Sequence, residues 1–290
     1  MRPAIPTLLR FCILLAALYA VLLLLAATFQ RNLIYFPGPP LDPGITEIGV
    51  FQKVAYQTSD GLSLFGWYAP PTGDQPTIVY FHGNAGKASD RIPRAYPLVR
   101  QGFGVLLAEY RGYGGAEGSP TEDGLYRDAQ AAIDWLRPQV KSPHHVILLG
   151  ESLGSGIATE MARREPAGLL VLLAPFTSLV DVAADRYWFF PVRTLIRDQF
   201  NNAEKFAALE LPTLIIHGTE DRVIPERHGR SLSEQAPRPA GYFPLPDTGH
   251  NTIPPDAVAG MIRDALSRPA GHRAPPIRQG FPQPDTTPAR

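Results

Sequence analysis

The pattern of apolar and polar positions divides the chain into short apolar runs that alternate with longer amphipathic stretches. Runs such as Val105–Ala108 and Leu169–Leu173 contain no polar residue, which is typical of parallel strands covered on both faces. The pattern predicts strands near residues 51–58, 62–69, 77–82, 103–109, 145–150, 168–174, 212–217 and 241–245, and helices near 89–101, 121–137, 153–164, 225–236 and 255–267. This alternation predicts an α/β fold with a mostly parallel eight-stranded sheet and helices on both of its faces.

Two segments depart from the alternation. Ser59-Asp60-Gly61, between the first two strands, is a hairpin signal, so we expect those strands to be antiparallel. The stretch 178–208 lacks a clear strand pattern and is predicted to form a small helical cap over the functional site.

The N-terminal part of the sequence predicts a membrane anchor. Residues 11–29 form an uncharged run of 19 residues, mostly Leu, Ala and Val. At about 1.5 Å per residue, such a helix spans roughly the ~30 Å hydrocarbon core of a bilayer. A cleaved signal peptide is the alternative, but its apolar region is usually shorter, and Ala26-Ala27-Thr28 is a poor cleavage site.

Basic residues predict the orientation of this anchor. Arg2 and Arg10 precede the apolar run, which favours a cytoplasmic N-terminus and a catalytic domain on the opposite side, the periplasm in a bacterium. The last segment is rich in proline and is predicted to be a disordered tail. The predicted organisation is a cytoplasmic start (1–10), a transmembrane anchor (11–29), one large domain (30–267) and the tail (268–290).

The composition excludes several classes of function. The 290 residues include 27 basic and 27 acidic side chains, so the net charge of zero offers no footprint for nucleic acid. The one cysteine, Cys12, excludes an intramolecular disulfide and a cysteine-rich zinc site. The sequence has no phosphate-binding or dinucleotide-binding motif, so we expect neither a cofactor nor a metal.

Gly150-Glu151-Ser152-Leu153-Gly154 is the motif with the clearest chemistry. It follows the apolar run Val146–Leu149, and G-x-S-x-G between a strand and a helix is the pattern of a nucleophile elbow, whose sharp turn exposes the serine hydroxyl. The pentapeptide alone is weak support, because an ordinary turn serine would also fit it. Catalytic partners further along the chain therefore decide its interpretation.

Asp221 and His250 are the predicted partners. They follow Ser152 in the Ser, Asp, His order of an α/β-hydrolase triad, and each comes just after a predicted strand. In such a triad the histidine takes the serine proton and the aspartate fixes the histidine tautomer. Glu220 and Asp247 are the alternative carboxylates.

Two backbone N–H groups are expected to form an oxyanion hole. One belongs to Leu153, directly after the serine, and the other to Asn84, in the loop that follows the strand near 77–82. His82 is expected to shape this loop, and His217 is interpreted as a packed structural histidine. Arg111 is expected to have a structural role at the end of its strand and to hydrogen-bond backbone groups, with substrate contact as the alternative.

These motifs show a resemblance to a known family. The chain resembles the N-terminally membrane-anchored branch of the α/β-hydrolases, which includes lysophospholipid lipases, protein depalmitoylases and their bacterial relatives. The resemblance covers about residues 30–267 and rests on seven blocks: Ser59-Asp60-Gly61 with Gly66-Trp67-Tyr68, His82-Gly83-Asn84-Ala85-Gly86, Tyr110-Arg111-Gly112-Tyr113-Gly114, Gly150-Glu151-Ser152-Leu153-Gly154, Ala174-Pro175-Phe176-Thr177-Ser178, His217-Gly218-Thr219-Glu220-Asp221 and Gly249-His250-Asn251. It implies the α/β-hydrolase fold, the triad Ser152, Asp221 and His250, and the oxyanion hole of Asn84 and Leu153.

The favoured function is hydrolysis of carboxylic ester or thioester bonds in acyl substrates, lipids among them, through an acyl-Ser152 intermediate. An amidase or peptidase with the same triad stays open, because one fold hosts many chemistries. A catalytically silent anchored scaffold is the third alternative, and the intact triad argues against it.

Four consecutive aromatic residues, Tyr187, Trp188, Phe189 and Phe190, lie in the predicted cap. On a helix, four successive residues cannot share one core-facing stripe, so we expect one or two of them to face the active-site cleft or the membrane. Tyr and Trp also favour a water–lipid boundary. We predict that the cluster forms the apolar mouth through which an acyl chain reaches Ser152; packing of the cap onto the main domain is the alternative.

Overall fold

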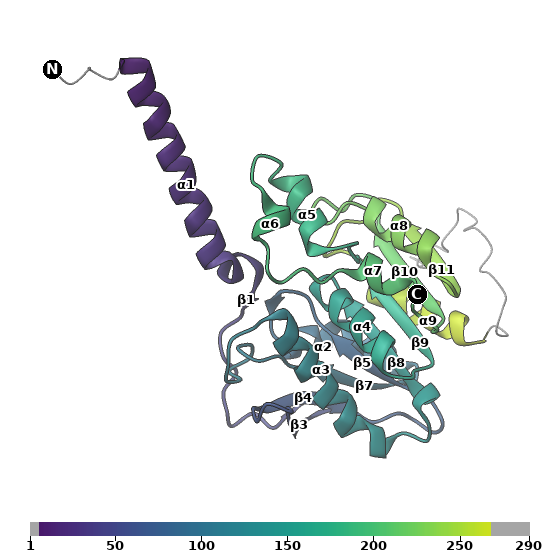
Figure 1. Cartoon of the computed structure of the whole chain (residues 1–290). Helices are drawn as coiled ribbons and strands as arrows, with labels where there is room; N and C mark the ends of the chain where they lie inside the picture. Colours follow the sequence, from purple (N-terminus) through teal and green to yellow (C-terminus); the bar gives the residue numbers. More distant parts are fainter. Residues whose placement is uncertain (1–5, 268–290) are drawn as a thin grey trace, which may run out of the picture.

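A nine-stranded sheet in the order β11-β10-β9-β8-β5-β7-β4-β3-β2 forms the centre of the protein (Figure 1). The computed structural model describes residues 6–267. The strands of the sheet are β2 (Glu47–Ile48), β3 (Phe51–Gln57), β4 (Ser63–Ala69), β5 (Thr77–Phe81), β7 (Gly104–Ala108), β8 (Val146–Glu151), β9 (Leu169–Leu173), β10 (Thr213–Gly218) and β11 (Pro239–Leu245). All eight predicted strands are present, and the two-residue β2 extends one edge.

The sheet is parallel from β7 to β11 and antiparallel at its other edge. Strand β5 pairs in parallel with β7 and β8, and the parallel pairing continues through β9 and β10 to β11. The pairs β2–β3, β3–β4 and β4–β7 are antiparallel, which confirms the hairpin predicted at Ser59-Asp60-Gly61. Every residue of β5, β7, β8, β9 and β10 is buried, as expected of strands that are mostly apolar and covered on both faces.

Helices cover both faces of the sheet, and the alternation of side chains along β5 separates two cores. Val79 and Phe81 pack in the core formed with α3 (Glu122–Leu136) and α4 (Leu153–Arg164), whereas Ile78 and Tyr80 pack in the core formed with α2 (Ile92–Arg100) and α9 (Pro255–Ser267). The five predicted helices are present as α2 (Ile92–Arg100), α3 (Glu122–Leu136), α4 (Leu153–Arg164), α8 (Arg227–Gln235) and α9 (Pro255–Ser267), with single 3₁₀ turns at Ala88–Arg91, Arg137–Gln139 and Pro143–His145.

The predicted cap region is helical. It contains α5 (Leu179–Arg186), α6 (Val192–Leu195) and α7 (Asn202–Phe206). Ser178 caps α5, because its hydroxyl accepts a hydrogen bond from the Asp181 N–H at 3.0 Å. His228 of α8 lies within 2.9 Å of both the Thr177 hydroxyl and the Asp185 carboxylate, so it fastens α5 to the main domain.

Helix α1 (Thr7–Ile34) projects from the domain on the side where α5 and α6 lie (Figure 1). Its most apolar 18-residue window has a mean hydropathy of 2.7 and none of it is buried, so α1 is long and apolar enough to cross a membrane. The helix is longer than the predicted span 11–29 and is broken at Phe29, where φ is −101° and ψ is 15°. The predicted tail and residues 1–5 lie outside the described residues.

The part of α1 after Phe29 is docked on the cap. The Gln30 side chain donates to the Leu195 carbonyl at 3.1 Å and accepts from the Arg197 N–H at 2.8 Å. Arg31 forms an ion pair with the buried Asp198 carboxylate at 3.0 Å. After the break, Gln30 and Arg31 therefore make polar contacts with the cap, whereas most apolar residues before the break are exposed.

Candidate active site

Ser152 occupies the turn between β8 and α4. Its φ of 52° and ψ of −117° are a backbone conformation that residues other than glycine rarely adopt, as a nucleophile elbow requires. The Ser152 N–H still donates to the Leu173 carbonyl of β9 at 2.9 Å, so the turn stays attached to the sheet. The strained conformation of Ser152 is thus held by hydrogen bonds of its own N–H to Leu173 and of its carbonyl to the Ser155 N–H.

The two glycines of the motif allow α4 to fold back closely over the strands. A Cβ built on Gly150 would lie 2.7 Å from the Ser155 Cα, and one on Gly154 would lie 2.6 Å from the Phe81 carbonyl carbon. Both distances are too short for a side chain, because the obstacles are backbone atoms. This close approach is the reason that the sequence has glycine at these positions.

The structure brings Ser152, His250 and Asp221 together from three separate loops. His250 Nε2 lies 3.0 Å from Ser152 Oγ, and His250 Nδ1 lies 2.6 Å from Asp221 Oδ2. Asp221 follows β10 and His250 follows β11, so all three residues lie beyond the carboxyl ends of parallel strands. Neither Glu220 nor Asp247 takes the place of Asp221 beside the histidine.

Asp221 is held as a carboxylate by several donors. Its Oδ1 accepts hydrogen bonds from the Val223 and Ile224 N–H groups, both at 2.8 Å. Burial opposes ionisation, but hydrogen bonds from His217 and His250 outweigh it and hold the pKa of Asp221 well below its usual range. Asp221 is therefore charged at neutral pH.

His217 is packed beside this carboxylate. It is fully buried, and its Nε2 lies 2.9 Å from the Ile224 carbonyl and 3.3 Å from Asp221 Oδ2. The interpretation as a packed histidine is correct, but its contact with Asp221 has no signal in the sequence beyond a spacing of four residues.

The loop after β5 lies beside the serine. A Cβ built on Gly83 would be 3.5 Å from the Ser152 Cβ, and Asn84 comes next in the chain. Within residues 6–267, no backbone acceptor is found for the N–H of Asn84 or of Leu153, the first residue of α4. The loop after β5 and the start of α4 thus each provide one backbone N–H donor near Ser152.

His82 is a buried residue at the start of this loop. Its imidazole is 1% exposed, with Nδ1 2.7 Å from the Gly83 carbonyl and Nε2 3.1 Å from Glu109. Tyr110 packs on the ring at a centroid distance of 4.2 Å and donates its hydroxyl to the His82 carbonyl at 3.0 Å.

Asn84 is held by the segment that follows α1. Its side-chain amide donates to the Ile34 carbonyl, and its carbonyl accepts from the Phe36 N–H, both at 2.9 Å. Strand β1 (Phe36–Pro37) then pairs in parallel with β6 (Ala85–Gly86). The sequence predicts none of these contacts, since the partners are about fifty residues apart and lie in short irregular segments.

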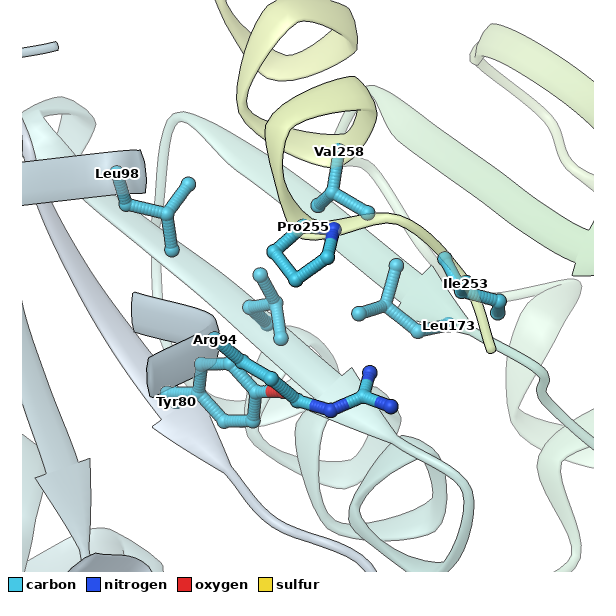
Figure 2. Close-up of a pocket in the computed structure, with 8 residues that line it drawn as sticks. Tyr80, Arg94, Leu98, Leu173, Ile253, Pro255 and Val258 are labelled. Carbon is cyan, nitrogen blue, oxygen red and sulfur yellow. The ribbon is translucent and has the colours of Figure 1, made fainter. Parts of the chain in front are cut away.

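Two arginines of α2 and its preceding turn brace the loops of the site. Arg91 pairs at 3.1 Å with Glu151, which also accepts from the Tyr80 hydroxyl at 2.6 Å. Burial opposes ionisation of Glu151, but Arg91 and Tyr80 outweigh it, so its pKa lies below the usual range. Arg94 donates to the Asn251 carbonyl, directly after His250, and lines a small crevice with Tyr80, Ile253 and Pro255 (Figure 2).

The prediction of backbone hydrogen bonds for Arg111 is wrong. Its guanidinium does not hydrogen-bond the backbone of its loop but binds two carboxylates, Asp128 of α3 at 2.7 Å and Asp60 of the β3–β4 hairpin at 2.8 Å. A buried guanidinium needs charged partners, and the fold brings two from distant positions.

Three of the four predicted substrate-binding aromatics are exposed. Tyr187 is 48%, Trp188 83% and Phe189 52% exposed, so these side chains do not pack the cap onto the main domain. The helix assumed for them ends at Arg186, and the residues form a turn instead. In residues 6–267, no group of three His, Cys, Asp or Glu side chains is arranged to hold a metal ion.

Known protein families match this chain in sequence. Residues 73–190, which include Ser152 but neither Asp221 nor His250, match the sequence model of a hydrolase family described as serine aminopeptidase, S33. The uncharacterized protein Rv2307c of Mycobacterium tuberculosis is 39% identical over 244 residues, covering 82% of this chain and 86% of the relative. The α/β-hydrolase domain-containing protein WAV2 of Arabidopsis thaliana is 28% identical, covering 73% of this chain and 77% of its own length.

Solved structures match the fold. The esterase Pf2001 of Pyrococcus furiosus superposes with a TM-score of 0.63 at 18% identity, covering 80% of this chain and 96% of the esterase. At this identity the likeness concerns the fold alone. The sequence relatives and the fold agree, and the chain belongs to the α/β-hydrolase family.

Proposed function

We propose that this protein is a serine hydrolase that cleaves carboxylic ester or thioester bonds of acyl substrates through an acyl-Ser152 intermediate. The observation that carries the proposal is the chain of contacts Ser152 Oγ, His250 Nε2, His250 Nδ1 and Asp221 Oδ2, at 3.0 Å and 2.6 Å. This order of atoms gives each group of a catalytic triad the neighbour it needs.

The chemistry proceeds in two halves. His250 Nε2 takes the proton of Ser152 as Oγ attacks the substrate carbonyl, and the charged Asp221 stabilises the imidazolium. The N–H groups of Leu153 and Asn84 donate to the tetrahedral oxyanion, each worth about 3 kcal/mol. His250 returns the proton to the leaving alcohol or thiol, and water then releases the acyl group from Ser152 by the same steps.

The same proposal includes a membrane anchor. Helix α1 is apolar, unburied and long enough to span a bilayer, and Arg2 and Arg10 favour a cytoplasmic N-terminus. The hydrolase domain is then on the opposite side, the periplasm in a bacterium. Nucleic acid is not proposed as a partner, since the basic and acidic residues of the chain are equal in number.

Labelling with a fluorophosphonate probe tests the catalytic proposal. The native protein should be labelled, Ser152→Ala should not be, and the matched control Ser155→Ala, at a buried serine of the same helix, should be. Unlabelled native protein would support the silent scaffold. A series of acyl esters, thioesters and amides then separates the proposed activity from an amidase or peptidase, which would prefer the amides.

A further inference from the structure

The exposed aromatic turn of the cap and the middle of α1 lie against each other. We define residues 187–190 as the aromatic turn. The Tyr19 hydroxyl of α1 donates to the Phe189 carbonyl at 2.7 Å, and the rings of Tyr19 and Phe190 stack at a centroid distance of 6.0 Å and an angle of 16°. The aromatic turn is therefore attached to the apolar part of the helix, not to its water-exposed end.

The cap contacts α1 at two positions, and their separation shows how far the aromatic turn extends along the helix from the break at Phe29. Gln30 and Arg31 meet Leu195, Arg197 and Asp198 near the break, whereas Tyr19 meets Phe189 and Phe190. Tyr19 precedes Gln30 by eleven residues, which is about 16 Å along a helix. One leaflet of a bilayer contributes about half of the ~30 Å hydrocarbon core, so this reach equals the apolar depth of a leaflet.

The charges of the cap follow the same axis. Residues 187–192 carry no charge, and Arg186 and Arg193 flank them. Near the break of α1, the exposed Arg197 adds positive charge where lipid phosphates would lie, whereas the half-exposed Arg31 is paired with Asp198. Arginine side chains near the edge of the hydrocarbon region extend toward the lipid headgroups. An uncharged segment flanked by arginines is therefore suited to insertion.

We propose that the aromatic turn inserts, together with α1, into the hydrocarbon region of the leaflet on the side of the hydrolase domain. Trp188, Phe189 and Tyr187 are exposed in the protein because lipid covers them in the membrane. An acyl substrate in the same leaflet could then pass to the cap without leaving the membrane. The insertion rests on the proposed anchoring by α1, and the substrate route rests on the proposed hydrolase activity.

Tryptophan quenching in vesicles tests the insertion without any need for catalysis. The full-length protein contains three tryptophans, of which Trp67 is buried and Trp188 is the most exposed. In phosphatidylcholine vesicles with brominated acyl chains, we expect quenching of an emission component that Trp188→Phe removes, and the same quenching in Ser152→Ala. Quenching of that component by aqueous iodide but not by brominated lipid would overturn the insertion. Loss of the protein from the vesicles in alkaline carbonate would overturn the anchor and the insertion together.

Activity tests the route of the substrate. Phe189→Asp should lower hydrolysis of a long-chain acyl ester in vesicles at least about tenfold more than it lowers hydrolysis of a water-soluble short-chain ester. The matched control is Val50→Asp, a similarly exposed apolar residue in the turn of the β2–β3 hairpin, which should change neither rate. Equal losses on both esters would overturn the leaflet route and mark a structural role.

Discussion

The side-chain amide of Asn84 donates a 2.9 Å hydrogen bond to the carbonyl of Ile34, the residue that ends α1. Asn84 is also the residue whose backbone N–H we assign to the oxyanion hole. Helix α1 and the loop beside Ser152 are therefore connected directly, because the chain continues from Ile34 into the β1–β6 pairing on the same loop.

Removal of this hydrogen bond should slow catalysis without loosening substrate binding. In Asn84→Ala the backbone N–H is kept but no longer fixed by the amide, so we expect kcat to fall about tenfold with KM nearly unchanged; complete loss of such a donor costs roughly 10²–10³. Steady-state kinetics on a short-chain ester measures this. Gln30→Ala, which removes contacts of α1 with the cap and with its own Ala27 carbonyl, is the control, and an unchanged kcat in Asn84→Ala would refute the role of the loop.

A methyl group at one glycine of the elbow should be disruptive and at another glycine harmless. In Gly154→Ala the new Cβ would press on the Phe81 carbonyl carbon at 2.6 Å, so α4 must shift and Ser152 with it. We expect a loss of stability of several kcal/mol or no soluble protein. Gly260→Ala is the matched control: apart from the neighbouring backbone of α9, no atom lies within 4 Å of its Cβ, and in this helix alanine should stabilise by up to about 1 kcal/mol. Equal melting temperatures for the two variants would contradict the close approach.

Substitution of Arg111 should destabilise the domain through the carboxylate left behind. Asp128 is fully buried, and burial raises its pKa despite the hydrogen bonds from Arg111. Arg111→Met leaves this carboxylate unpaired, at a cost of about 3–5 kcal/mol. Arg111→Lys should recover only part of the loss, because an ammonium cannot serve both carboxylates with the paired donors of a guanidinium. Denaturant unfolding of the three proteins measures the order.

Glu160 should make the stability of the domain depend on acidic pH. This buried carboxylate contacts Arg163, Arg164 and Lys205; burial opposes ionisation, but these cations lower its pKa to about 2. A pKa below the unfolded value of about 4.3 means that the carboxylate stabilises the fold above that pH and that this contribution is lost as the pH falls toward 2. Glu160→Gln should therefore be less stable by about 2–3 kcal/mol at pH 7, with the difference shrinking by pH 3.

Unfolding curves of the Glu160 variant at pH 7 and pH 3 measure the change. The exposed Glu117, substituted as Glu117→Gln, is the control and should show no difference at either pH. A constant difference between native protein and Glu160→Gln at both values would show that packing, not charge, is the cause.

The strands, the helices and the elbow could be predicted because each is written locally in the sequence. Buried parallel strands need uninterrupted apolar runs, and Gly150 and Gly154 mark a place where backbones approach. The order of Ser152, Asp221 and His250 along the chain then follows from the fold, and the structure brings these three residues within hydrogen-bonding distance.

Contacts between distant irregular segments could not be predicted. Arg111 pairs with Asp60 and Asp128 because the β3–β4 hairpin and α3 meet around it, and neither partner has a spacing that indicates the pairing. The aromatic turn lies in the stretch 178–208 that is predicted as a helical cap, yet α5 ends at Arg186 and the turn contacts α1. Such pairings depend on tertiary structure, which local patterns do not contain.

The break in α1 at Phe29 has a consequence for processing of the chain. A cut at Ala26-Ala27-Thr28 would fall just before the break and would remove Tyr19 while keeping Gln30, Arg31 and the β1 strand. The shed protein would keep the attachment of Asn84 and the ion pair to Asp198, but its aromatic turn would lose the helix it rests on. One proteolytic event would thus separate the proposed membrane anchor from a domain that keeps the same arrangement of Ser152, His250 and Asp221.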